Sequence, residues 1–278
     1  MTGSTDHLAA QSFATDRPQS GPARNWSEDL EEFHEESTRD HPIECLTRGQ
    51  VLSHLDPLAP TATVIEIGCS TGYLLADLRA HFRDARLIGL DFIASGLHKA
   101  RANVPNAHVA QADACHLPLP DRCADAIVSV NLLEHVADDV GALAEIARVL
   151  RPGAPAVLVV PTAPNLYDYY DRFLHHERRY ARGEMARKAV RVGLDVEVDH
   201  QLGSVVFPAF WAIKKRNRLR FNGLSGDALA DRVKRDYEST QVSGVFGVAC
   251  ALERRMLDAR IRLPFGIRGL TVVRRPVA

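Results

Sequence analysis

Several features that would each indicate a particular class of protein are missing from this sequence. The five cysteines are odd in number and form no C-x-x-C pair, which argues against a zinc site or a disulfide framework and for reduced thiols. The formal net charge is −1, so composition gives no electrostatic case for binding nucleic acid. No apolar stretch reaches membrane-spanning length, and the N-terminus shows no signal-peptide pattern. We therefore expect a cytoplasmic globular protein.

One segment, residues 64–73 (V-I-E-I-G-C-S-T-G-Y), carries the strongest functional signal. A β-branched run ends in an acidic residue, turns through glycines and continues as a helical pattern. Glycine allows a tight turn and a close approach of the backbone to a ligand, and a helix N-terminus offers free N–H groups. A second apolar run, at 86–90, ends in Asp91, where a carboxylate can accept hydrogen bonds from ribose hydroxyls. Together these features predict a site for a nucleoside-bearing cofactor.

Two other enzyme classes share parts of this segment. A dinucleotide fingerprint starting at Gly68 needs glycine at Ser70 and a small residue at Tyr73, which disfavours an NAD(P)-dependent oxidoreductase. Residues 68–72 also match the hydrolase pattern G-x-S-x-G. Only one strand candidate and no glycine-rich oxyanion segment precede that pattern, so the hydrolase ranks lower still. A non-catalytic binding protein is the remaining alternative.

The chain resembles the class I S-adenosylmethionine-dependent methyltransferases along roughly residues 60–200. Residues 66–72 look like the family's first motif, E/D-x-G-x-G-x-G, and Asp91 stands at its ribose-binding position. Asp113, followed by Leu-Pro-Leu-Pro, looks like the aspartate that contacts the adenine amino group. Residues 125–136 resemble the fourth strand with its loop, and residues 148–153 resemble the turn before the fifth strand.

The resemblance implies S-adenosylmethionine as the cofactor. The residues that it implies for cofactor binding are Glu66, Gly68, Cys69, Ser70, Gly72, Asp91, Phe92, Asp113, Ala114 and Asn131. Ser70 departs from the family pattern, which has glycine at this position. A serine there crowds the methionine end slightly, but it can donate a hydrogen bond to the cofactor's carboxylate.

Strand and helix patterns alternate along the chain, which predicts an α/β fold with a doubly wound, seven-stranded and mostly parallel sheet of the Rossmann-like methyltransferase type. Strands are expected near 63–67, 86–90, 107–111, 124–130, 156–160, 194–200 and, antiparallel beside the fifth, 269–274. Helices are expected near 42–55, 73–82, 94–103, 138–150 and 242–261.

The same patterns divide the chain into five parts. These are a disordered tail (1–25), an N-terminal helical cap (26–60), the cofactor-binding core (61–201), a helical lid insertion (202–265) and the last core strand (266–278). Within the cap, residues 28–36 suit a short acidic helix over the cofactor mouth or on the surface. Residues 205–221 place an apolar aromatic segment before a basic run, a pattern typical of peripheral contact with an anionic membrane. A substrate lid is the favoured interpretation, and one segment can serve both purposes.

Methyl transfer to a hydroxyl benefits from a base near neutral pKa, and histidine is the natural choice. The family layout directs attention to His135, after the fourth strand, and to His176, after the fifth. Tyr167, Tyr170 and Tyr180 are candidates for contact with the acceptor. We expect a small molecule or glycan methylated at a hydroxyl oxygen. The alternative is a lipid-linked or quinone-type acceptor at a membrane surface.

The arginines near His176 have two interpretations. They could bind a phosphate or carboxylate of the acceptor, or they could form a solvated face; they are Arg172, Arg178, Arg179 and Arg182.

Overall fold

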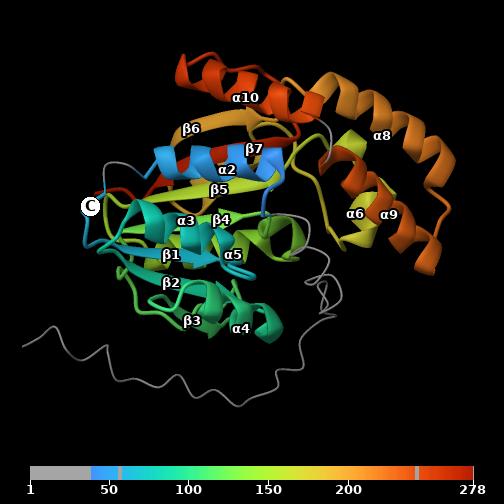
Figure 1. Ribbon diagram of the computed structural model, residues 1–278. Coiled ribbons are helices and arrows are strands. Elements are labelled where there is room, and N and C mark those ends of the chain that lie inside the picture. The colour runs from blue at the N-terminus through green and yellow to red at the C-terminus, as the bar shows by residue number, and fades with distance from the viewer. Residues whose placement is uncertain (1–38, 56–57, 242–243, 278) are drawn as a thin grey trace, which may run out of the picture.

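The computed structural model describes residues 39–55, 58–241 and 244–277. The predicted tail at 1–25 and the acidic helix at 28–36 lie outside these ranges. A seven-stranded sheet forms the centre of the molecule (Figure 1). Its strands are β1 (Thr63–Ile67), β2 (Arg86–Asp91), β3 (His108–Gln111), β4 (Ala126–Val130), β5 (Pro155–Pro161), β6 (Asp195–Leu202) and β7 (Arg268–Arg274).

The strand order is β3-β2-β1-β4-β5-β7-β6. Strands β1 to β5 pair in parallel, whereas β7 runs antiparallel to both β5 and β6. This confirms the predicted mostly parallel sheet with its antiparallel last strand beside the fifth. A dinucleotide-binding sheet of order 3-2-1-4-5-6 has no antiparallel strand at this place, so the topology also separates the chain from that class.

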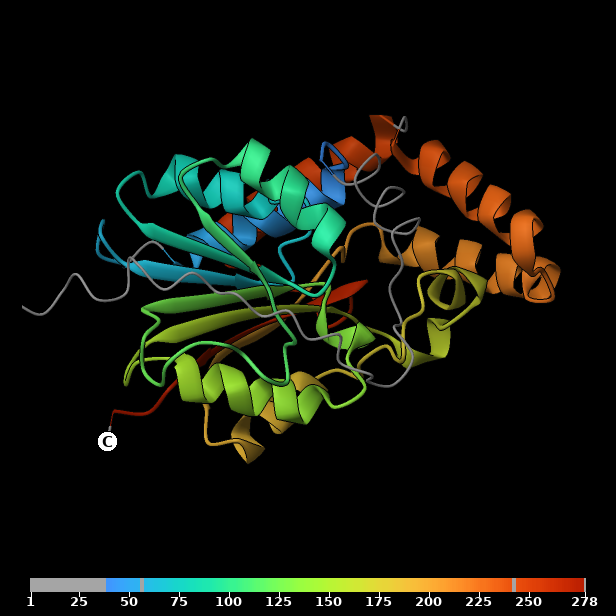
Figure 2. The ribbon, with the colours of Figure 1, turned by 90° about the horizontal axis from the view of Figure 1, so that it is seen from below.

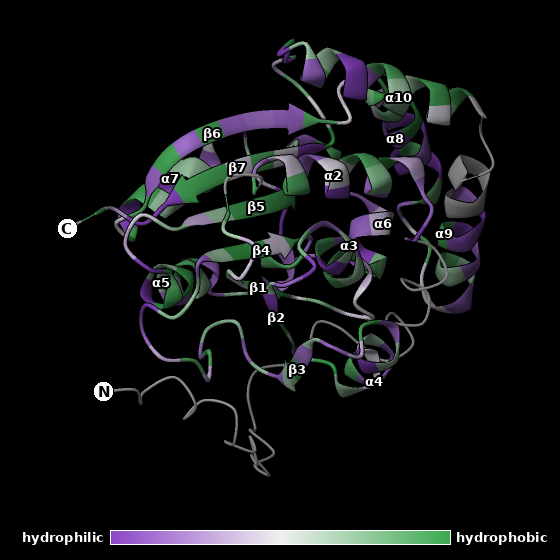
Figure 3. Cartoon of the chain, turned by 60° about the vertical axis from the view of Figure 1, so that its left-hand side comes forward, coloured by the Kyte–Doolittle hydropathy of each residue, from purple (hydrophilic) through white to green (hydrophobic). Residues whose placement is uncertain are grey.

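Burial explains the hydropathy of the strands. Every residue of β5 is buried, as expected for a strand that is covered on both faces. In Figure 3, β6 is largely hydrophilic while β5 and β7 are hydrophobic. Strand β6 pairs only with β7 among the described residues, so its alternating pattern correctly predicts an edge strand.

Helices cover both faces of the sheet (Figure 2). On one face lie α2 (Pro42–Ser53), α3 (Tyr73–His81) and α4 (Ala94–Asn103), and on the other lie α5 (Asp139–Val149) and α7 (Glu184–Arg191). Neighbouring strand residues point to opposite faces. Val64 therefore packs with Leu75 of α3, while Ile65 packs with Leu143 of α5.

The insertion between β6 and β7 is helical, as predicted. It contains α8 (Phe207–Phe221), α9 (Gly226–Gln241) and α10 (Gly244–Asp258). Helix α10 packs on α2 through Ile43, Leu46 and Cys250. Helices α8 and α9 lie beside α6 (Tyr169–Phe173), beyond the sheet (Figure 1). Among the described residues, no helix has both the length and the apolar character needed to cross a membrane.

Because β6 runs parallel to β5, the insertion starts at the same sheet edge as the loops that follow β1, β2, β4 and β5. The loop after β4 contains the short 3-10 helix η1 (Leu133–His135), and the loop after β5 contains η2 (Pro164–Leu166) and α6. The fold therefore gathers every predicted site segment at the carboxyl ends of the strands.

Candidate active site

The sheet order reverses between β1 and β4, and ligands of open α/β sheets bind at such a switch point. Glu66, near the end of β1, lies in register with Gly89 of β2 and Val128 of β4. The turn after β1 therefore stands between the loops that follow β2 and β4. This is the position that the predicted cofactor motif requires.

Three residues of this turn adopt left-handed backbone conformations: Gly68 (φ 82°), Ser70 (φ 46°) and Gly72 (φ 83°). A Cβ on Gly72 would lie 3.1 Å from the Cβ of Ala100, so glycine also permits close packing against α4. The conformation at Ser70 explains why glycine is the usual residue at the middle of this motif. The side chain of Ser70 carries a backbone cost there that glycine would avoid.

Asp91 joins the turn after β1 to the start of α4. Its Oδ2 accepts a hydrogen bond from the Ser70 backbone N–H at 2.8 Å, and its Oδ1 accepts one from Ile93 at 2.8 Å. The neighbouring Phe92 ring is 45% exposed, which suits the predicted contact with adenine. Cys69 is buried, and a Cβ on Gly89 would come within 2.9 Å of its Sγ, so Cys69 serves as packing beneath the turn.

Glu66 gives a direct test of whether the turn fits the cofactor. The residue is 4% exposed, and its Oε2 has no hydrogen-bond partner among the described residues. Burial raises the pKa of Glu66, and the nearby Asp91 carboxylate raises it further. A cationic ammonium group, such as that of the methionine part of S-adenosylmethionine, would satisfy this oxygen and restore the charged form. The residues present therefore fit the predicted cofactor.

Asp113 and Ala114 lie where the adenine end is expected. The Ala112 backbone N–H donates to the Asp91 carbonyl at 2.8 Å, which holds this segment beside β2. The Oδ1 of Asp113 accepts a hydrogen bond from the Cys115 N–H at 2.8 Å, and the Asp113 side chain is 42% exposed. The side chain of Asp113 is therefore partly open to solvent, and its Oδ2 lies 3.4 Å from Nδ1 of the exposed His116.

The structure brings together the two histidines that were predicted as bases. Asn131 ends β4 in a left-handed conformation (φ 52°), and its N–H donates to the Val159 carbonyl of β5. His135 follows in η1, and its ring meets that of His176 edge to face, with centroids 4.7 Å apart. Glu134, buried between β4 and the segment after β5, accepts a backbone hydrogen bond from Glu177 at 2.8 Å.

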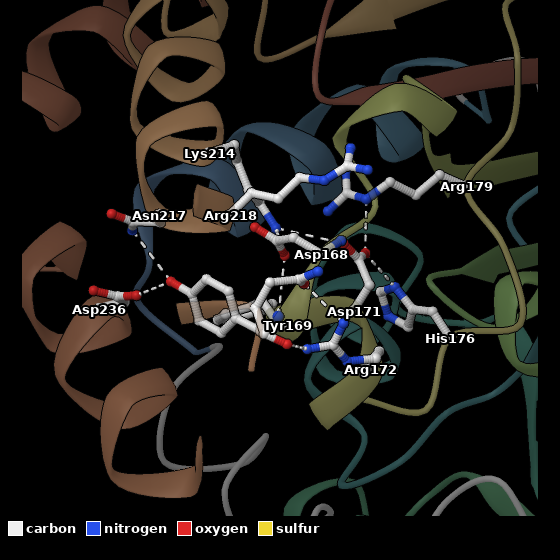
Figure 4. Close-up of polar contacts among 12 residues, drawn as sticks. Asp168, Tyr169, Asp171, Arg172, His176, Arg179, Lys214, Asn217, Arg218 and Asp236 are labelled. Carbon is white, nitrogen blue, oxygen red and sulfur yellow. Dashed lines mark hydrogen bonds and ion pairs between the residues drawn. The ribbon is translucent and has the colours of Figure 1, made fainter. Parts of the chain in front are cut away.

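His176 belongs to a buried charge network, which holds its ring through Nδ1 (Figure 4). The network consists of Asp168, Asp171, His176, Arg179 and Lys214. Asp171 is the centre: its carboxylate accepts from His176 Nδ1 at 2.9 Å, from Arg179 Nε at 2.7 Å and from Lys214 Nζ at 3.4 Å. Lys214 also donates to Asp168 at 2.6 Å. The basic neighbours hold the pKa of Asp171 below its usual value despite burial, so this carboxylate is ionised.

The ionised Asp171 fixes the tautomer of His176. A carboxylate can only accept, so Nδ1 of His176 carries the proton and Nε2 keeps its lone pair. Burial lowers the pKa of His176, which keeps the imidazole neutral. The carboxylates of Asp168 and Asp171 balance the positive charges of Arg179 and Lys214. Because His176 is neutral, the network carries no net charge.

This network also corrects two expectations. Arg179 is neither a solvated residue nor one that binds a phosphate of the acceptor, because it is buried against Asp171 and donates to the Thr162 carbonyl at 3.2 Å. Lys214 is not part of a basic surface, because it is 8% exposed and paired with Asp168. Sequence reasoning missed Asp168 and Asp171, whose spacing of three is that of the capping box which starts α6.

The three candidate tyrosines occupy different environments. Tyr167 donates its hydroxyl to the His176 carbonyl at 2.7 Å. Tyr170 lies beneath Lys214, whose Nζ is 5.2 Å from the ring centroid. Tyr180 is 1% exposed and donates to Asp139 at 2.7 Å, so the structure places it in the core and away from any acceptor.

Known proteins with similar sequences include methyltransferases, in agreement with the candidate cofactor site described above. Residues 65–158 match the methyltransferase domain family. A probable S-adenosylmethionine-dependent methyltransferase of Mycolicibacterium smegmatis is 31% identical over 139 residues, which cover 48% of this chain and 52% of that protein. A fatty-acid O-methyltransferase of the same organism is 37% identical over 92 residues, 32% of this chain and 34% of that protein. The chain thus spans about half the length, or less, of these curated relatives.

Among solved structures, geranyl diphosphate methyltransferase in complex with geranyl diphosphate and sinefungin superposes with a TM-score of 0.57. The sequence identity is 14%, and the match covers 84% of this chain and 79% of that one, so the likeness concerns the fold. The order and direction of the strands define a Rossmann-like methyltransferase architecture. Residues 65–158 are therefore a methyltransferase domain, and its similarity to S-adenosylmethionine-dependent methyltransferases confirms the predicted resemblance and cofactor.

Proposed function

We propose that this chain methylates a hydroxyl oxygen of a small molecule or glycan. The observation that carries the proposal is the position of the His135–His176 pair, which lies at the same sheet edge as the cofactor turn. When bound, S-adenosylmethionine supplies an activated methyl group on a sulfonium. The chain itself has to hold the cofactor, place the acceptor oxygen and assist loss of the hydroxyl proton.

Each of these tasks has proposed residues. Glu66 and the turn at Gly68–Gly72 bind the methionine end, Asp91 binds the ribose, and Asp113 binds the adenine amine. His135 and His176 assist loss of the proton. Two imidazoles can do so in two ways: one ring can take the proton, or both can bind a cation that makes the hydroxyl more acidic.

The similarity to the fatty-acid O-methyltransferase of M. smegmatis supports oxygen as the methylated atom. It also supports a second candidate function, methylation of a lipid-linked or quinone-type acceptor at a membrane surface. The specific observation in its favour is α8, which exposes Trp211, Ile213 and Leu219 together with basic residues. The small-molecule or glycan acceptor is preferred because the pairing of Lys214 with Asp168 and Asp171 joins α8 to the buried network behind His176.

The test is incubation of the protein with S-adenosylmethionine labelled in the methyl group and with fractionated cell extracts. We expect label in a water-soluble fraction, and its stability to base would distinguish an ether from an ester. Label in the lipid fraction would favour the second candidate. If neither fraction becomes labelled although calorimetry shows that the protein binds adenosylhomocysteine, the result would contradict both acceptor classes.

A further inference from the structure

Three potential metal ligands meet on the acceptor side of the site. Glu134, His135 and His176 each present one ligand atom, and these three atoms lie within 4.8 Å of one another. Glu134 is 1% exposed, yet its Oε2 has no hydrogen-bond partner among the described residues. Burying such an oxygen without a partner is costly, so the arrangement lacks an explanation in packing alone.

His176 is oriented as metal-ligating histidines usually are. Such histidines donate their second ring N–H to a carboxylate or carbonyl, which fixes the tautomer and directs the other nitrogen to the metal. Here Nδ1 donates to the ionised Asp171 at 2.9 Å, and Nε2 keeps its lone pair. Asp171 is in turn held by Arg179 and Lys214, so the ring has little freedom to turn.

We propose that Glu134, His135 and His176 bind one divalent transition-metal ion. Two imidazoles and one carboxylate suit zinc, cobalt, manganese or ferrous iron better than magnesium or calcium, which prefer oxygen ligands. Three protein ligands leave coordination positions open, as in catalytic rather than structural sites.

The local charge fits a dication. Neutral imidazoles and one carboxylate give the ligand set a charge of −1, while the nearby Arg179 and Lys214 are balanced by Asp168 and Asp171.

The inference deepens the proposed function, and its consequence for the acceptor rests on that function. Open positions beside the crevice suit an acceptor with two adjacent oxygens, such as a vicinal diol of a sugar or a hydroxy acid. A dication lowers the pKa of a hydroxyl beside it. The hydroxyl proton then leaves to water, the new O–C bond forms, the C–S bond breaks, and its electron pair stays on sulfur. His135 and His176 serve as ligands and do not take the proton themselves.

Titration of the full, untagged chain with Co²⁺ tests the site without any turnover. The protein is first treated with EDTA and dialysed, and binding is followed by the visible absorption of coordinated Co²⁺. We expect one equivalent to bind, at least tenfold weaker binding in Glu134→Gln and in His176→Asn, and displacement by Zn²⁺. His175→Asn is the matched control: His175 is the adjacent, exposed histidine, so this variant should bind like wild type.

Absence of saturable Co²⁺ binding by the wild-type chain would overturn the inference, as would unchanged affinity in both ligand variants. If a variant fails to fold, X-ray absorption of the Zn²⁺-loaded wild type tests the inference instead. The proposed site requires scattering from two imidazoles, and a spectrum without it would overturn the inference. Calorimetry with adenosylhomocysteine separates the two proposals. A chain that binds adenosylhomocysteine but no Co²⁺ lacks the metal site and keeps the proposed function, whereas a chain that binds neither loses both.

Discussion

The carboxylate of Asp91 has a structural role in the turn after β1 and a proposed role in cofactor binding. It accepts hydrogen bonds from the Ser70 and Ile93 backbone N–H groups, so it shapes the cofactor turn, and it is the proposed partner of the ribose. We expect Asp91→Ala to weaken binding of adenosylhomocysteine about 10- to 100-fold, the cost of losing a charged hydrogen bond. Calorimetry measures this change.

The control for that prediction is Asp84→Ala, which removes an exposed aspartate in the turn before β2. It should bind adenosylhomocysteine as the wild type does. If Asp91→Ala kept wild-type affinity and melting temperature, Asp91 would have no part in the cofactor site.

His200 makes stability depend on pH. The residue is 5% exposed in β6, both ring nitrogens lack hydrogen-bond partners among the described residues, and burial lowers its pKa to about 4. The unfolded chain takes up this proton near the ordinary value of 6.5, so it binds more protons than the folded chain between pH 6.5 and 4. Stability should therefore fall as pH drops through this window, by up to about 3 kcal/mol for this one group.

His200→Leu should remove that part of the pH dependence, measured as the free energy of urea unfolding at pH 7 and pH 5. His98→Leu, at an exposed position of α4, should leave the wild-type slope intact. Equal slopes in wild type and His200→Leu would show that His200 is protonated in the folded protein.

Residues of the proposed cofactor site can be recognised in the sequence because their signals are local. Glu66, Gly68 and Gly72 fall within seven consecutive positions, and glycine at a positive φ is recognisable from the turn alone. The contact of Lys214 with Asp171 joins residues 43 positions apart, on elements whose packing no local pattern specifies. Because no local pattern reveals this contact, the sequence predicts Lys214 as part of a basic surface run although it is buried.

The same distinction holds for whole elements. Helix α4 begins and ends where its pattern predicts, and each predicted strand exists with small shifts at its ends. Four helices, α6 to α9, had no predicted range of their own, although α8 and α9 fall within the predicted helical insertion. Helix α7 is short, and α9 has few apolar residues in sixteen, so its sequence resembles a polar linker. Its place is fixed by tertiary contacts, such as that of Asp236 with Tyr169 of α6.

Helix α8 is joined to the segment after β5 by the contact of Lys214 with Asp168 and Asp171, among others. Lys214→Met should destabilise the protein by about 3–5 kcal/mol, because it removes one partner of a buried ion pair and leaves carboxylates poorly compensated. Hydrogen exchange should show faster opening of α8 and α6 than of the central strands.

Lys215→Met is a matched control on the next residue, since Lys215 is exposed and stacks on Trp211 with its Nζ 4.5 Å from the ring centroid. It should change stability by less than about 1 kcal/mol. Equal effects of the two substitutions would mean that Lys214 is solvated in solution and that the buried network does not hold α8.

At the scale of the molecule, one edge of the sheet carries the turn after β1, the loops after β4 and β5, and the start of the insertion (Figure 1). The outer surface of α8 adds a further property to this edge. Trp211, Ile213 and Leu219 are 38%, 47% and 89% exposed. The exposed basic residues of α8 are Lys215, Arg216, Arg218 and Arg220, and the helix contains no acidic residue.

Exposed apolar side chains beside unopposed positive charge favour an anionic lipid surface, where each basic residue contributes about 1 kcal/mol. We therefore expect the protein to sediment with vesicles that contain phosphatidylserine and not with vesicles of phosphatidylcholine alone. Higher salt should weaken the binding, because it screens the exposed charges. The double charge reversal Lys215→Glu with Arg220→Glu should lower vesicle binding by tenfold or more.

Charge reversal at Arg254 and Arg255, exposed residues of α10, changes the net charge by the same amount away from α8 and should have a smaller effect. If the two double variants lost binding equally, attraction would depend on net charge and not on this helix. If the α8 variant bound as the wild type does, α8 would not contact lipid. The second candidate function would then lose the observation on which it depends, because a lipid-linked acceptor could no longer be delivered along this helix to the site beneath it.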